Sequence, residues 1–443
     1  MISAFGGQYR HVSAYTIFGR HDQKVIDQLA RCLAAEPGSR GALCADGHFG
    51  YSAPIGGVMA YREHVSPSGV GYDIGCGNKA VLTDLRADDI RSDLPGLMDR
   101  IYREVSFGMG RSNDEPVDHE VLDEIRQAPF APQRELYDLA ARQLGTVGAG
   151  NHYVDLFEDE NGAVWVGVHF GSRGFGHKTA SGFLSLAAGG RFGERGHDGE
   201  MESPPVLLRT DSEVGQAYIA AMTLAGAYAY AGRDVVVHKV LDILGASGVE
   251  EVHNHHNFAW RERHGGEDLW VVRKGATPAQ PGQRGFVGST MGEQSVILEG
   301  VASPRSEEAL HSTVHGAGRA MSRTAAAGRS RRRWACDNRD CGWMQGAGQP
   351  KPRAGRCPAC GGSRLSRRMV QLSPGAIDWQ ATRAELDARG IELRGGAADE
   401  APGAYKRLAD VLAHHEGTIR VVHTLTPLGV AMASADTFDP FKD

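Results

Sequence analysis

The sequence predicts a mixed α/β (α+β) fold, with one large domain, Gly-rich loops and a small inserted zinc ribbon. Three observations predict it. Several segments carry apolar residues at helical spacing, among them Val214–Ala231. Short apolar runs such as Ala163–Val168 and Trp270–Lys274 have the pattern of strands, and glycine-rich loops follow them. Four cysteines near the C-terminal part form two pairs, as in a zinc ribbon.

The expected elements can be justified in chain order. Phe18–Ala35 carries apolar residues at helical spacing, and Ala87–Val105 and Pro116–Gln143 are also mostly helical in pattern. Val214–Ala231 is rich in small apolar residues and is expected to be a buried helix. Ser295–Leu298 follows a Gly-rich loop and is expected to be a strand.

Composition narrows the class of protein. With 443 residues, 41% of them apolar and 23% charged, the chain can bury one large core or two. No apolar run approaches the ~20 residues of a membrane span, and no signal pattern is visible, so no membrane partner is expected. Seven cysteines, four of them in one cluster, favour a reducing cytoplasm.

The net charge of −6 conceals a basic segment. Residues 329–368 hold 11 Lys and Arg but only two Asp and no Glu, a net +9 that leaves −15 on the remainder. The zinc ribbon lies in this segment, with Trp334 and Trp343 as candidate stacking faces. Contact with RNA or DNA is the favoured interpretation, and a purely structural zinc knob is the alternative. The expected ligands are Cys336, Cys341, Cys357 and Cys360.

This insertion divides the chain into three predicted parts. Residues 1–328 would form the main part of the large domain, 329–368 the ribbon, and 369–443 the C-terminal part of the large domain.

Several Gly-rich loops carry candidate chemistry. His315 is followed by glycines and Arg319, which can cradle a phosphate beside an imidazole. Asp73 and Cys76 lie three residues apart among glycines and can face one metal ion, although a buried free cysteine beside a turn is the simpler interpretation. Asp46 and His48 can support a site, although a plain turn is the better explanation of this stretch taken alone. Further imidazoles follow at His152, at His169 and in the run His253–His256.

Taken together, seven motifs in order resemble the RtcB family of RNA ligases over roughly residues 40–325 and 370–432. They are DIGCG at 73–77, GAGNH at 148–152, HFGSRG at 169–174, HHN at 255–257, RKGAT at 273–277, HGAGR at 315–319 and DEAPGAYK at 399–406.

The resemblance implies a set of roles. Cys76 would bridge two Mn(II) ions, with Asp73 and His152 completing one set of ligands and His169 and His256 the other. His315 would attack the α-phosphorus of GTP and become guanylylated. Asn151, Arg173 and Arg319 would hold phosphates. The nucleotide pocket would consist of Asn151, His152, Tyr153, Val154, Asp155, His256, Asn257, Gly288, Ser289, Thr290, Met291, Ser295, Gly316, Ala317, Gly318 and Tyr405.

The chain departs from the family pattern in the pocket as well as by its insertion. Met432 stands where the family has a lysine that contacts guanine, and Asp155 stands for a glutamate that is one methylene longer. Ser295, Asp155, Lys406 and Lys442 are the candidates to replace the missing hydrogen bond.

The implied activity is a GTP- and Mn(II)-dependent RNA ligase that joins 3′-phosphate or 2′,3′-cyclic phosphate ends to 5′-hydroxyl ends. Its partners would be GTP and broken RNA, including tRNA halves, in tRNA splicing or RNA repair. A nucleic-acid 3′-end capping enzyme or phosphoesterase with the same metal centre is one alternative, and an inactive metal protein that binds broken ends is another.

Overall fold

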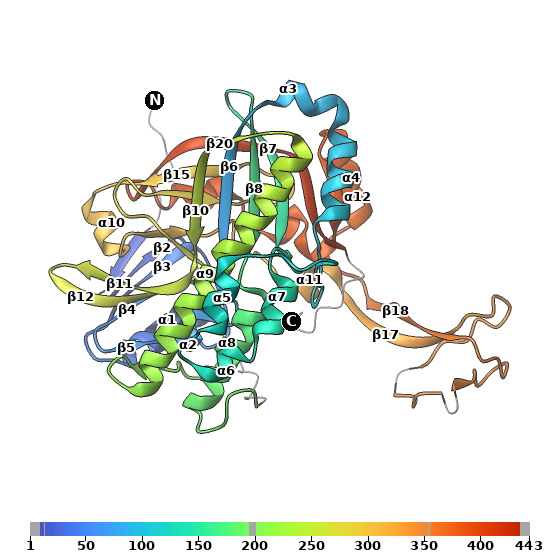
Figure 1. Ribbon diagram of the computed structural model, residues 1–443, viewed down its shortest axis with the longest axis horizontal. Helices are drawn as coiled ribbons and strands as arrows, with labels where there is room; N and C mark the ends of the chain where they lie inside the picture. Colours follow the sequence, from blue (N-terminus) through green and yellow to red (C-terminus); the bar gives the residue numbers. More distant parts are fainter. Residues whose placement is uncertain (1–8, 13, 195–200, 347, 353–354, 435–443) are drawn as a thin grey trace.

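Two β-sheets and their covering helices make up the body of the molecule, and a long two-stranded arm projects from it (Figure 1). The computed structural model describes residues 9–12, 14–194, 201–346, 348–352 and 355–434. The mixed α/β fold predicted from the sequence is confirmed. Lys442 and the outer ends of the predicted domains lie outside the described residues, and the domain boundaries remain predictions.

One sheet has six strands in the order β1-β2-β3-β4-β12-β11. Neighbouring strands are antiparallel except for β2 and β3, which are parallel. Helix α1 packs against β3 and β4. The strands are β1 (Tyr9–Val12), β2 (Tyr15–Phe18), β3 (Arg40–His48), β4 (Ile55–Tyr61), β12 (Glu267–Lys274) and β11 (Asn257–His264).

The second sheet has eight strands, in the order β10-β6-β8-β7-β20-β15-β14 with β19 also paired to β20. The 16-residue strand β20 crosses its middle and joins the C-terminal part of the chain to strands from the first half. The strands are β10 (Gly248–His255), β6 (Gly77–Arg86), β8 (Ala163–Phe170), β7 (Tyr153–Asp159), β20 (Ile419–Ser434), β15 (Ser295–Gly300), β14 (Arg284–Val287) and β19 (Glu392–Gly396).

Three smaller strand pairs complete the described β-structure. These are β13 (Ala276–Pro278) with β16 (Ser312–Val314), β5 (His64–Val65) with β9 (Leu208–Arg209), and β17 (Arg329–Cys336) with β18 (Leu365–Ser373), which form the arm.

The helices cover the sheets, and the longest, α9, lies across the eight-stranded sheet (Figure 1). Val236, Val237 and Val240 of α9 pack with buried valines of β7 and β8, because both faces of that contact are apolar. The helices are α1 (Gln23–Ala34), α2 (Pro67–Val70), α3 (Ala87–Ile90), α4 (Leu94–Glu104), α5 (Glu120–Arg126), α6 (Ala131–Arg134), α7 (Tyr137–Gln143), α8 (Arg173–Ala187), α9 (Glu213–Leu244), α10 (Pro304–Glu308), α11 (Arg323–Ala327), α12 (Trp379–Ala388) and α13 (Leu408–Ala413).

Some element boundaries differ from the sequence-based expectation for local reasons. The first helix begins at Gln23 rather than Phe18, because Tyr15–Phe18 pairs as β2 and Gly19 turns the chain with φ of 78°. The helix expected over Pro116–Gln143 is three short helices, and Pro129 lies in the break between α5 and α6. Helix α9 continues past Ala231 to Leu244 and ends at Gly245, whose φ of 65° is left-handed.

No helix in the described parts of the chain is long and apolar enough to cross a membrane.

Candidate active site

The candidate site is a cavity of about 290 Å³ lined by the ends of strands from both sheets and by glycine-rich loops. Most residues predicted for the site line it. They are Asp73, Cys76, Asn151, His152, Tyr153, Asp155, His169, His256, Asn257, Gly288, Ser289, Thr290, Met291, His315, Gly316, Ala317, Gly318, Arg319 and Tyr405.

A thiol and two imidazoles form the tightest group in the cavity. The Cys76 Sγ lies 3.8 Å from His152 Nε2 and 3.9 Å from His169 Nε2. A carboxylate oxygen of Asp73 lies 3.3 Å from the same His152 nitrogen. Sulfur, imidazole nitrogen and carboxylate oxygen turned toward one point are a donor set for a transition-metal ion.

Hydrogen bonds at Nδ1 fix how these imidazoles face the cavity. His152 Nδ1 bonds the carbonyl of Val147 at 2.9 Å, and His169 Nδ1 bonds Asn78 Oδ1 at 2.7 Å. Each contact occupies Nδ1 and leaves Nε2 toward the cysteine, as in metal sites where a second contact orients the ligand. Asn78 was not predicted as a site residue.

Two glycines leave room for this group. Gly148 has φ of 103°, and a Cβ there would lie 2.8 Å from His152 Nδ1 and even closer to the Arg173 guanidinium. A Cβ on Gly171 would overlap the Asp73 carboxylate. Glycine is therefore required at both positions for the cluster to close.

Burial sets the protonation of the group. Desolvation, reinforced by neighbouring histidines, lowers the pKa of His169 well below its usual value, so its imidazole is neutral at pH 7. Burial, followed by the charge of Asp73, raises the pKa of the Cys76 thiol well above its usual value. Coordination of a cation reverses the preference at the cysteine, because it favours the thiolate.

His256 lies beyond this group, between it and His315. Its ring stacks on His169 with centroids 5.2 Å apart and meets His315 edge-on at 5.0 Å. The buried His256 Nδ1 has no hydrogen-bond partner within the described residues. An orphaned imidazole nitrogen beside a thiol and two further imidazoles fits a bound metal ion.

His315 follows β16 and is held by Asp46 of β3. Its Nδ1 lies 2.5 Å from Asp46 Oδ2, and its backbone N–H donates to the same oxygen at 3.0 Å. With the proton on Nδ1 donated to the carboxylate, the lone pair of Nε2 is free for chemistry. The structure therefore gives Asp46, which had a weak sequence signal, a direct contact with the predicted nucleophile.

The Asp46 carboxylate is fully buried. Burial alone would raise its pKa, but the charge and the hydrogen bonds of His315 bring that pKa below its usual value. The carboxylate is thus ionised at neutral pH and favours the Nδ1–H tautomer of His315.

Arg233 of α9 holds the backbone next to two of the candidate metal ligands. Its fully buried guanidinium donates to the carbonyls of Gly75 at 2.9 Å and Phe170 at 2.6 Å. These residues directly precede Cys76 and follow His169, so one side chain fixes the backbone at two candidate ligands. An arginine within an apolar helix was its only sequence signal.

Two arginines, Arg319 and Arg323, also line the cavity. Arg319 donates to the Tyr405 hydroxyl at 3.0 Å and to the carbonyl of Asp399 at 2.8 Å. Arg323 pairs with Asp399 and Glu400. Arg323 and Glu400 were not predicted, although both stand in or beside recognised motifs.

Three predicted residues are placed differently. Arg173 is absent from the described lining of the cavity and donates to Thr146 Oγ1 at 3.2 Å and to the carbonyl of Gly108 at 3.3 Å. Val154 packs into the core on the opposite face of β7, because side chains alternate along a strand. Ser295 supports the wall of the pocket by accepting the backbone N–H of Ser289 at 2.9 Å.

The strand pairing places Met432 in the pocket. It lies opposite Tyr153 in the β20–β7 register, lines the cavity and is 5% exposed. Asp155 lines the same wall, and its Oδ1 has no partner among the described residues. Lys406 donates to the carbonyls of Ala45 at 2.9 Å and Gly47 at 3.1 Å. Of the described candidates to replace the missing lysine, Asp155 is the one with a free polar atom in the cavity.

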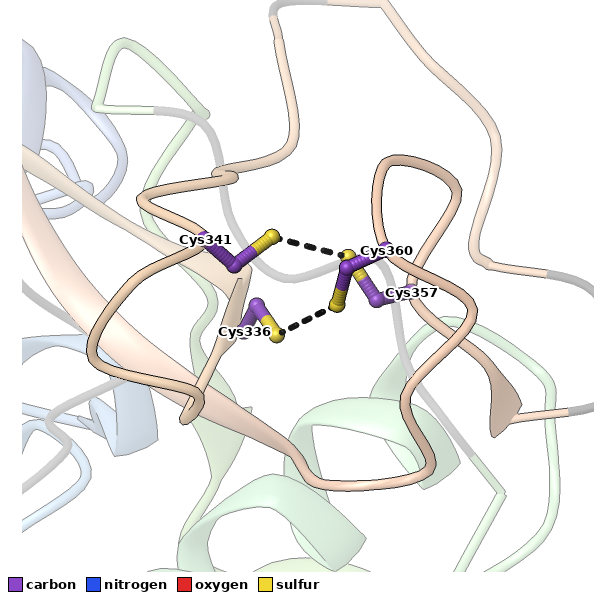
Figure 2. Close-up of side chains that lie close together, drawn as sticks. All are labelled: Cys336, Cys341, Cys357 and Cys360. Carbon is purple, nitrogen blue, oxygen red and sulfur yellow. Dashed lines mark hydrogen bonds between the residues drawn. The ribbon is translucent and has the colours of Figure 1, made fainter.

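The four cysteines of the arm meet at a separate point (Figure 2). Cys336 Sγ lies 3.6 Å from Cys360 Sγ, and Cys341 Sγ lies 3.6 Å from Cys357 Sγ. A tetrahedral zinc ion with bonds of about 2.3 Å separates its sulfurs by about 3.8 Å. The cluster therefore has the size and the donor set of a structural zinc site.

The fold and this cavity define an α/β protein with a buried group of potential metal ligands beside a histidine–aspartate pair. A family model described as tRNA-splicing ligase RtcB matches residues 30–360. The chain therefore belongs to the RtcB family.

Individual relatives agree with this assignment. The RNA-splicing ligase RtcB of Escherichia coli is 31% identical, over 64% of this chain and 75% of the relative. The tRNA-splicing ligase RtcB of Thermococcus kodakarensis is 30% identical over 87% of this chain and 86% of its own, and that of Archaeoglobus fulgidus is 29% identical over 95% and 94%.

Proposed function

We propose that this chain, as an RNA ligase, joins RNA 3′-phosphate or 2′,3′-cyclic phosphate ends to 5′-hydroxyl ends, using GTP, two Mn(II) ions and a guanylylated His315. Membership of the RtcB family supports the RNA ligase class. The observation that carries the finer proposal is the Asp46–His315 pair, whose His315 lines the same cavity as Cys76, His152 and His169.

The residues of the metal group fit the proposed ions. Asp73, Cys76 and His152 would hold one ion, and Cys76, His169 and His256 would hold the other, because Cys76 Sγ lies within 3.9 Å of both His152 Nε2 and His169 Nε2. Bound there, the ions would neutralise the charge that develops on phosphate oxygens.

His315 is the proposed nucleophile. Its Nδ1–H stays bonded to Asp46, and the lone pair of Nε2 attacks the α-phosphorus of GTP as pyrophosphate leaves. The guanylate then passes to the RNA 3′-phosphate and regenerates the imidazole. The 5′-hydroxyl attacks that activated phosphate, GMP departs, and the phosphodiester bond forms. A 2′,3′-cyclic phosphate end is first hydrolysed to the 3′-phosphate.

Residues in the walls of the cavity are proposed to position the phosphates and the base of the nucleotide. Arg319 and Asn151 line the cavity and are the proposed phosphate contacts, whereas the proposed role of Arg173 is indirect, through the loop that carries His152. The unpartnered Asp155 carboxyl oxygen is the proposed contact to the base. The four cysteines of the arm are proposed to hold one zinc ion apart from the manganese.

The test is incubation of the protein with Mn(II) and GTP labelled at the α-phosphate, followed by a denaturing gel. Label is expected on native protein and absent from His315→Ala, and the bond should be labile to acid and stable to base. Addition of RNA with 3′-phosphate and 5′-hydroxyl ends should then give joined product. Label in the His315→Ala variant would contradict the proposed nucleophile.

A nucleic-acid 3′-end capping or phosphoesterase activity is the second candidate. Met432, in place of a hydrogen-bond donor to guanine, is the observation that favours it. The same assay separates the two, because a capped or dephosphorylated 3′ end without joined product would support the second candidate.

A further inference from the structure

The arm carries a second cavity, which the proposed chemistry does not use. It has a volume of about 490 Å³, within the range of pockets that hold nucleotide-sized ligands. Its described lining contains five cationic side chains, one tryptophan and two glutamines, but no carboxylate. The lining residues are Arg331, Arg332, Arg333, Trp334, Gln345, Gly346, Gly348, Gln349, Lys351 and Arg367.

The strand register explains why these groups gather. Trp334 of β17 lies directly opposite Arg367 of β18, and Arg332 lies opposite Met369. Residues two apart on a strand share a face, so these four side chains cover one side of the hairpin. The Arg367 guanidinium lies 5.8 Å and the Lys351 ammonium 5.4 Å from the centre of the Trp334 ring.

The two carboxylates in the described part of the arm, Asp337 and Asp340, do not line this cavity. Asp337, at the end of the strand pair near the cysteines, is paired with Arg368 at 2.8 Å and lies outside the cavity. Met369 is 50% exposed, which leaves apolar surface beside the cations. Cations next to exposed flat or apolar side chains attract phosphates and accept unpaired bases.

The arm begins beside the candidate active site. Arg323 lines the active-site cavity and opens α11, and the arm strand β17 starts at Arg329. The intervening helix α11 has five residues, a length of about 7 Å. The arm is therefore joined by one short helix to the wall of the cavity that holds His315.

We propose that this face of the arm binds the single-stranded end of an RNA substrate, with phosphates on its arginines and unpaired bases on Trp334 and Met369. The inference rests on the RNA ligase function proposed above. A single strand fits because its bases are free to stack, whereas those of a duplex are stacked on one another.

The test measures binding of a labelled 20-nucleotide single-stranded RNA with a 3′-phosphate across a range of salt concentrations, without GTP. The variant Arg332→Gln/Lys351→Gln/Arg367→Gln removes three cations that line the cavity on the side of Trp334. Its control, Arg103→Gln/Arg261→Gln/Arg263→Gln, removes three exposed arginines from the body, each with a side chain at least 66% exposed.

Each lost phosphate contact lowers the salt slope by about 0.7, so the arm variant should lose about 2 in slope and bind roughly 50-fold more weakly at 0.15 M salt. The control should stay within about threefold of native. Trp334→Leu should weaken binding roughly fivefold or more with the salt slope unchanged, because it removes a stacking face and no charge. Zinc content of all variants shows that the arm remains folded.

An arm variant with native affinity and salt slope overturns the proposal, as does a duplex of the same sequence that binds as tightly as the single strand. Label transfer from GTP, measured on the same proteins, separates this failure from that of the proposed function. Labelled protein with an unaffected salt slope refutes the arm alone, whereas unlabelled native protein refutes the guanylylation step whatever the arm binds.

Discussion

Replacing Asp46 by asparagine tests the most specific contact in the site. Asp46 is fully buried, and its Oδ2 accepts both the Nδ1–H and the backbone N–H of His315. Asparagine keeps the shape of the side chain but removes its charge. Its amide can also turn a nitrogen toward Nδ1, which would favour the tautomer that carries the proton on Nε2.

The size of the effect follows from the type of hydrogen bond. A hydrogen bond to a charged group contributes about 1.5–3 kcal/mol. If that energy is lost in the transition state for attack on GTP, label transfer slows roughly 10- to 150-fold, at about 1.36 kcal/mol per factor of ten. Binding of GTP should change little, because Asp46 is not among the described residues that line the cavity.

The assay is single-turnover label transfer from GTP to the protein at saturating GTP and Mn(II). Asp211→Asn is the control, because it also removes a carboxylate with a lowered pKa, held by Arg209 on the exposed surface. Circular dichroism and thermal melting check that both variants are folded. A rate for Asp46→Asn within about twofold of native would refute the reasoning that Asp46 sets the reactive tautomer.

The Asp46–His315 pair also predicts that the stability of the protein depends on pH. The pKa of Asp46 is lower in the folded protein than in the unfolded chain. The ionised carboxylate therefore contributes to the free energy of unfolding at pH values above its pKa in the unfolded chain. That contribution is lost as pH falls through its pKa in the folded protein. Native protein should therefore lose more stability than Asp46→Asn as pH falls below about 4. Chemical unfolding at pH 7 and at pH 3.5 measures this, and equal losses would contradict it.

Three further predictions concern the ligands. Cys76→Ala should lose most of both manganese ions, because one sulfur is proposed to serve both, and two ions retained by metal analysis would exclude the bridge. Met432→Lys should sharpen the preference of label transfer for GTP over ATP by roughly one to two orders of magnitude, because one hydrogen bond to a charged group contributes about that much. If the native chain already discriminates between GTP and ATP as sharply as the variant, another group replaces the lysine. Cys357→Ser should lose the zinc ion, as measured by metal analysis, but should keep label transfer from GTP, because none of the proposed catalytic residues lies on the arm. A loss of label transfer while the body is still folded would contradict this separation of the arm from the active site.

The sequence by itself determined the features that local patterns encode. Helical spacing indicated α9, apolar runs indicated β8 and β12, and paired cysteines indicated the zinc ribbon. The ordered motifs indicated the family, and they contain just over half of the described residues that line the cavity. These features depend on neighbours within a few residues, which a sequence displays directly.

Only the tertiary structure decided which distant residues touch. Asp46 and His315 are 269 positions apart, and only their packing together gave the aspartate more than a weak signal. The alternation of β7 turned Tyr153 and Asp155 toward the cavity and Val154 into the core, and the register of β20 brought Met432 beside them. Such contacts depend on strand pairing and on side-chain direction across the whole sheet, because the same local pattern is compatible with many registers until the core is packed.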